Sequence, residues 1–151
     1  MTAAMTSRFL RPALAGFALL AGLSLTVPAL AAPVELKADM SAASEVPPTD
    51  SAGKGAVTAT YDADSKTLSW KGTYSGLSGP AVAAHFHTGE PGKNGGVTVP
   101  IFTSADKAGS PFEGKATLTD AQAADLLAGK MYVNVHTAAH KAGEIRGQVT
   151  K

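Results

Sequence analysis

The sequence predicts an all-β protein: an antiparallel, Greek-key-like β-sandwich of seven to eight short strands with one short helix. Two observations lead to this prediction. Beyond the first 31 residues, apolar and polar residues alternate in most segments, as they do in strands that bury one face. Turn-forming residues separate these segments at short intervals, and helical periodicity is confined to one place.

Each predicted strand is a short run between turn formers. In residues 34–40 apolar side chains alternate with charged ones, which is the pattern of a half-buried strand. Residues 62–65 are turn formers that join the next two runs as a hairpin. The prolines of residues 44–55 indicate a loop, because proline cannot serve a central strand. The predicted strands cover residues 34–40, 55–61, 66–74, 81–87, 97–102, 112–118, 130–137 and 143–150.

One segment, residues 118–130, has helical character. Thr119 can cap its start, Gln122 can complete a capping box, and Gly129 can end it. We therefore expect the single helix near residues 120–128.

The first 31 residues have the features of a secretory signal peptide. Arg8 and Arg11 precede an apolar stretch at 12–27, and Ala-Leu-Ala at 29–31 fits a small-x-small cleavage site. We expect cleavage after this site, export to the periplasm or out of the cell, and one mature domain of residues 32–151 without a membrane span. An uncleaved N-terminal anchor is the alternative.

The composition narrows the possible chemistry. The chain has no cysteine, which excludes disulfides, thiolate catalysis and cysteine-based metal sites. Its formal charge is +1, and it becomes −1 without Arg8 and Arg11, so there is no basic field for nucleic acid or a membrane surface. The sequence also lacks a GxSxG nucleophile elbow and a pair of carboxylates in an apolar setting. We assign no catalytic residue.

All four histidines lie in two short segments. His85 and His87 are one residue apart on a predicted strand, so their side chains share a face. His136 lies on the polar face of its own strand, and His140 lies in the loop that follows. If the strands pair, three or four imidazoles converge, and such a set without cysteine suits copper or zinc. We predict a metal site there, with His140 an auxiliary ligand or no ligand. The alternative is a solvated sheet face of ordinary polar histidines.

Four further polar residues are candidates for supporting or structural roles. Glu144 can accept an imidazole N–H and fix its tautomer, and Asn134 can hydrogen-bond to the histidines. Arg146 can form an ion pair with Glu144 or with Glu45 and lock a strand to a loop. The glycines of loop 89–96 are expected to supply positive φ in a strand connection, in preference to a nest for an anion.

The strand register also predicts the core. Phe86 shares a face with Val82 and Ala84, whereas Ala81 and Ala83 are placed on the face of the histidines. The residues assigned to the core are Phe86, Val133, Val135, Ile145 and Val149, together with Trp70, Tyr74, Met40 and Met131.

Several segments resemble the chordin-domain, or CHRD, family. They are SAASEVPP (41–48), SGLSGPAVAAHFHTG (75–89), TLTDAQAADLLAGKMYVNVHT (117–137) and GEIRGQV (143–149). The resemblance covers nearly all of the predicted mature domain. It implies an exported β-sandwich to which no catalytic activity is firmly attached.

A fainter resemblance links the HFHTG segment and residues 136–146 to copper/zinc superoxide dismutase. It implies that His85, His87 and His136 are copper ligands.

The resulting hypothesis is an exported, single-domain CHRD binding protein that holds copper, or alternatively zinc. Its expected partners are the metal ion and a second exported protein, and nucleic acid is not among them. The first alternative is a non-catalytic structural or adhesion module without metal, and the second is a dismutase-like redox enzyme.

Overall fold

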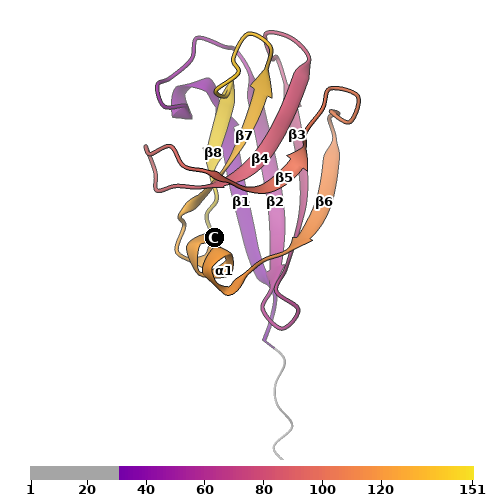
Figure 1. Cartoon of the computed structure of the whole chain (residues 1–151), viewed down its shortest axis with the longest axis vertical. Coiled ribbons are helices and arrows are strands. Elements are labelled where there is room, and N and C mark those ends of the chain that lie inside the picture. Colours follow the sequence, from indigo (N-terminus) through magenta and orange to yellow (C-terminus); the bar gives the residue numbers. More distant parts are fainter. Residues whose placement is uncertain (1–30) are drawn as a thin grey trace, which may run out of the picture.

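The computed structural model describes residues 31–151 (Figure 1). The predicted signal peptide, apart from Ala31, lies outside the described residues. Within residues 31–151, no helix is long and apolar enough to cross a membrane.

The described chain is all-β, as predicted, with eight strands, one α-helix and a short 3₁₀ turn. The predicted strand bounds agree with the observed ones to within about two residues at nearly every end. The strands are β1 (Val34–Ser41), β2 (Lys54–Asp62), β3 (Thr67–Ser75), β4 (Ala81–Thr88), β5 (Val97–Phe102), β6 (Phe112–Thr117), β7 (Met131–Thr137) and β8 (Ile145–Gln148). The 3₁₀ turn is η1 (Ala42–Ser44).

The helix α1 (Asp120–Leu127) begins as expected. The Thr119 side chain accepts from the backbone N–H of Gln122, and the Gln122 side chain accepts from the backbone N–H of Thr119. Ala123 and Leu126 are the buried residues of α1, which lies across one end of the sheet (Figure 1).

All strands pair antiparallel in one sheet of order β5-β4-β7-β8-β1-β2-β3-β6. The sheet curls until its end strands, β5 and β6, contact each other without pairing. Phe102 of β5 and Phe112 of β6 pack together at this seam, with ring centroids 6.2 Å apart. The result is a flattened, nearly closed sheet around one core (Figure 1).

The core lies between the two halves of the curled sheet. Trp70 of β3 meets Phe86 of β4 edge to face, with centroids 5.2 Å apart. Gly114, paired with Trp70 across β3 and β6, leaves room for the indole, because a Cβ there would overlap it. The predicted core residues are buried, except Tyr74, which is partly buried against the core.

One part of the predicted register is wrong. Ala81 was expected on the face of the histidines, but it is buried in the core. The reason is an irregularity in β4: Ala81 pairs with Thr137 and Ala83 with His136, so Val82 is an extra residue. A bulge of this kind reverses the alternation on its N-terminal side. From Ala84 onward the predicted alternation holds.

Candidate metal centre

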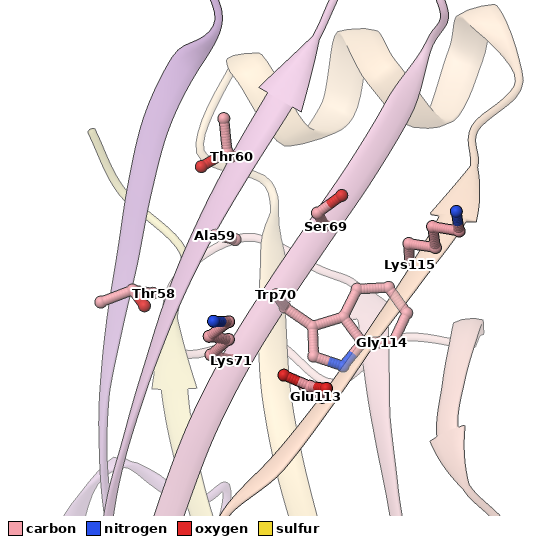
Figure 2. A pocket seen from close by; sticks show the side chains of 9 residues that line it. All are labelled: Thr58, Ala59, Thr60, Ser69, Trp70, Lys71, Glu113, Gly114 and Lys115. Atoms are coloured by element: carbon pink, nitrogen blue, oxygen red, sulfur yellow. The ribbon is translucent and has the colours of Figure 1, made fainter.

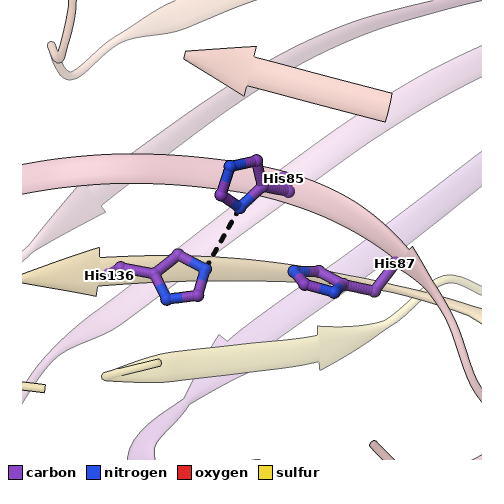
Figure 3. Close-up of side chains that lie close together, drawn as sticks. All are labelled: His85, His87 and His136. Carbon is purple, nitrogen blue, oxygen red and sulfur yellow. Dashed lines mark hydrogen bonds between the residues drawn. The ribbon is translucent and has the colours of Figure 1, made fainter. Parts of the chain in front are cut away.

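Three histidines meet on the outer face of the neighbouring strands β4 and β7 (Figure 3). Each offers one ring nitrogen, and these three atoms lie within 4.8 Å of one another. His85 and His87 come from β4, and His136 comes from β7, where it pairs with Ala83. The antiparallel pairing of β4 and β7 therefore brings together residues about 50 positions apart in the sequence, as predicted for strands that pair.

Backbone carbonyls fix the tautomers of two of the three rings. His87 Nδ1 lies 3.1 Å from the Gly95 carbonyl oxygen, and His136 Nδ1 lies 3.0 Å from that of Lys141. A carbonyl only accepts, so each Nδ1 carries the proton and each Nε2 carries the lone pair. His87 Nε2 is buried and has no hydrogen-bond partner in the described part of the chain. His87 Nε2 is therefore available to a cation, whereas His136 Nε2 has a neighbour in His85.

His85 completes the set. Its Nδ1 lies 3.2 Å from His136 Nε2. Because His136 Nε2 has no proton, His85 Nδ1 donates to it in the metal-free chain. For both nitrogens to bind one ion, the His85 proton would have to move from Nδ1 to Nε2. At metal–nitrogen distances of about 2.0–2.1 Å, this spacing would then give an angle of about 100° at the ion, close to tetrahedral.

The three ring nitrogens are spread more widely than the ligands of one metal ion. Two nitrogen ligands of a tetrahedral ion lie about 3.4 Å apart, so a pair at the limit of 4.8 Å would have to close by about 1.4 Å. Three nitrogen ligands also leave a coordination position open.

Burial keeps the three imidazole rings in their neutral form. Burial, followed by the neighbouring His136 and His87, lowers the pKa of His85 to about 4. Burial also lowers the pKa of His87 and of His136, against the opposing effect of the carbonyl that each Nδ1 contacts. All three imidazoles are therefore uncharged at neutral pH, which is the form that binds a metal.

The histidine face is not a solvated sheet surface. Every residue of β7 is buried, including the outward-facing Tyr132, Asn134 and His136, which contact the surrounding loops. His87 and His136 are 8% and 9% exposed, and His85 is intermediate. Asn94 links two of the covering loops by donating to the Val46 carbonyl. This observation contradicts the solvated arrangement of the histidines that was considered as an alternative.

Glu144 contacts hydroxyl groups instead of an imidazole. Its carboxylate accepts from the hydroxyls of Ser51 and Thr137 and from both the backbone N–H and the hydroxyl of Ser78, at 2.5–2.7 Å. Burial raises its pKa, but these bonds outweigh burial and hold the pKa at about 2. Glu144 thus ties two loops to the end of β7 as a fully buried carboxylate.

The ion pair expected for Arg146 is not formed among the described residues. Arg146 donates to loop 89–96, as detailed below, and Glu45 accepts from Asn134 Nδ2 at 2.6 Å. Burial raises the pKa of Glu45 to about 7, although the nearby Arg146 charge and the Asn134 bond lower it. The covering loop, with its carbonyl groups, occupies the space around the guanidinium where a carboxylate was expected.

Loop 89–96 needs its glycines mainly for close approach. Of these glycines only Gly92 has positive φ, so the expectation of positive φ holds at one position. A Cβ on Gly95 would overlap the carbonyl oxygen of Thr88. Glycine at this position lets the loop lie against β4 and bring the Gly95 carbonyl to His87.

His140 is not among the three histidines that meet. It lies in the turn after β7, where its backbone N–H bonds to the Thr137 hydroxyl. A role as auxiliary ligand stays a prediction.

Tyr132 and the carbonyl acceptors of Gly95 and Lys141 were not predicted from the sequence as parts of the site. Tyr132 stacks on His87, with ring centroids 4.8 Å apart and planes 6° apart. The sequence does place Tyr132 on the same face of β7 as His136, and this position could have suggested that Tyr132 lies beside the histidines. Backbone carbonyls leave no such signal in a sequence.

A surface depression of about 490 Å³ lies elsewhere, on β2, β3 and β6 (Figure 2). Its polar lining consists of threonine, serine, lysine and glutamate side chains, such as Lys71 and Glu113. It contains no histidine, and the histidine trio is not part of it.

Fold and site together define an all-β domain in which three converging imidazoles lie in a largely buried polar layer. The CHRD domain model matches residues 36–149, so the chain belongs to the CHRD family. This is a non-enzymatic domain family that occurs in extracellular proteins. No curated protein and no solved structure matches significantly, and the fainter likeness to superoxide dismutase is not shown by these comparisons.

Proposed function

We propose that this chain is an exported binding protein that holds one copper ion, or alternatively zinc, through His85, His87 and His136. The observation that carries the proposal is the buried Nε2 of His87, which has no hydrogen-bond partner within residues 31–151 and points towards His136 (Figure 3). Leaving a buried polar atom without a partner costs free energy, and a bound cation removes that cost. Copper is favoured because copper(II) binds nitrogen ligands more tightly than zinc.

Metal content tests the proposal directly. The exported protein, purified without a histidine tag, is expected to contain close to one equivalent of copper or zinc by mass spectrometry of the elements. In a competition for the metal-free protein, copper(II) should displace zinc, following the general affinity order for divalent ions. A protein that is metal-free when isolated, and that binds neither ion on addition, would instead support the alternative of a structural or adhesion module.

Export is a separate prediction. If residues 1–31 are a signal peptide, material recovered from the periplasm or the medium should begin at Ala32 or within about two residues of it. N-terminal sequencing of that material gives the answer. A product that stays in the cytoplasm and begins at Met1 would contradict export while leaving the histidine site untouched.

A further inference from the structure

Arg146, Tyr132 and His87 form a stack across three strands. The His87 and Tyr132 rings are nearly parallel, with centroids 4.8 Å apart, and the Arg146 guanidinium lies 3.5 Å from the Tyr132 ring centroid. An imidazole and a guanidinium cannot share one ring face at these distances. They therefore lie on opposite faces of Tyr132, in keeping with the strand order β4-β7-β8.

The same guanidinium holds loop 89–96. Arg146 Nη2 donates to the carbonyls of Lys93 at 2.8 Å and Glu90 at 3.2 Å, and Nη1 donates to Asn94 Oδ1 at 3.2 Å. Arg146 is only 2% exposed and forms no ion pair with a carboxylate among the described residues. Most hydrogen bonds of its guanidinium group therefore go to this one loop, chiefly to backbone carbonyls.

The far end of that loop reaches His87. The Gly95 N–H donates to the Tyr132 hydroxyl at 3.2 Å, and the Gly95 carbonyl faces His87 Nδ1 at 3.1 Å. Tyr132 therefore contacts both His87 and the residue that fixes the His87 tautomer. Arg146 contacts Tyr132 and the loop but not the histidines themselves.

We infer that Arg146 is a positioning residue of the histidine cluster. By stacking on Tyr132 and clamping loop 89–96, it holds the Gly95 carbonyl against His87 Nδ1 and leaves Nε2 as the free nitrogen. A partner that fixes the tautomer and orientation of a ligating histidine typically changes metal affinity by 10–100-fold. The effect on affinity rests on the proposed function, whereas the effect on the tautomer does not.

The test is the His87 tautomer in metal-free protein, read from long-range ¹H–¹⁵N correlation spectra. Wild-type protein should show the Nδ1–H form. In Arg146→Lys the charge remains, but the planar stack and the fork of donors are lost. This variant should show a mixture of both tautomers at His87 and bind zinc or copper at least about 10-fold more weakly.

Glu144→Gln is the control for a purely structural role. It disturbs a buried polar network on the same side of the sheet but does not touch loop 89–96, so it should lower stability and leave the His87 tautomer unchanged. If Arg146→Lys does not fold, Asn94→Ala is tested in its place. Asn94→Ala removes the hydrogen bond between Arg146 Nη1 and Asn94 Oδ1, and it should also produce the second His87 tautomer.

A folded Arg146→Lys or Asn94→Ala protein that keeps the pure Nδ1–H tautomer would overturn the inference. A tautomer change in protein that never binds metal would support the positioning role and refute the proposed function, so the two failures are distinguishable.

Discussion

The His85→Ala/His87→Ala double variant is expected to bind copper(II) at least about 100-fold more weakly than the wild type. It removes two of three nitrogen ligands and leaves His136 alone, and one imidazole cannot replace a converging set. Neither side chain belongs to the hydrophobic core, because both alternate along β4 with the buried Phe86. Calorimetric titration of tag-free residues 32–151 measures the difference.

His140→Ala is the matched control for that experiment. It removes the same side chain from a position outside the cluster, so its copper affinity should stay within about threefold of the wild type. A sharp loss in this variant would make His140 a ligand and require the turn after β7 to move. Equal, weak binding by wild type and double variant would leave the three histidines as a buried polar layer without metal.

Glu144→Gln is expected to lower the free energy of unfolding by about 2–3 kcal/mol at pH 7. The buried carboxylate accepts four hydrogen bonds from two loops and the end of β7, and a neutral amide cannot accept all of them. Urea denaturation followed by circular dichroism measures this loss.

The pH dependence of that stability has a definite sign. The pKa of Glu144 is about 2 in the folded chain, against an ordinary value of 4.5. A carboxyl whose pKa is lowered by folding stabilises the folded state fully above its unfolded pKa, and this contribution disappears as the pH falls from 4.5 towards 2. The difference in stability between wild type and Glu144→Gln should therefore shrink across this range.

Glu113→Gln provides the comparison on an exposed strand position. Glu113 lies on β6 with its side chain in solvent, so the same chemical change should shift stability by less than about 0.5 kcal/mol. If the two variants behaved alike at pH 7, the hydroxyl cage around Glu144 would not have the stabilising role assigned to it.

The strands and the helix were predictable because each depends on local pattern. Alternation in residues 34–40 and the Thr119/Gln122 pair act over a few positions and need no knowledge of distant residues. The exception, Ala81, also has a local cause, but a bulge such as that at Val82 leaves no recognisable mark in a run of small apolar residues.

The candidate site was predictable only in part. The spacing of His85 and His87 places them on one face, and the polar position of His136 suggested that it could join them. The segments that cover them could not be predicted from the sequence. Loop 89–96 and the turn at Lys141 follow the histidine strands directly, but the loop around Val46 comes from another part of the chain, and their joint packing depends on the tertiary fold. The burial of the histidine face and its neutral imidazoles follow from that covering.

The partners of the charged residues were the least predictable part. Opposite charges suggested ion pairs for Arg146, but its guanidinium binds the carbonyls of Glu90 and Lys93. Glu144 likewise contacts the hydroxyls of Ser51, Ser78 and Thr137. Serine hydroxyls and backbone carbonyls occur throughout the chain, so their pairing with a given charge depends on the tertiary fold alone.

The most direct test of the metal site is a crystal structure of tag-free residues 32–151 grown with copper, with anomalous diffraction recorded at the copper edge. We expect one strong peak about 2.0–2.1 Å from a ring nitrogen of each of His85, His87 and His136. The Nδ1 contacts of His87 and His136 to the Gly95 and Lys141 carbonyls should remain in place. Anomalous density elsewhere on the protein, or none at the three histidines, would contradict the proposed metal site.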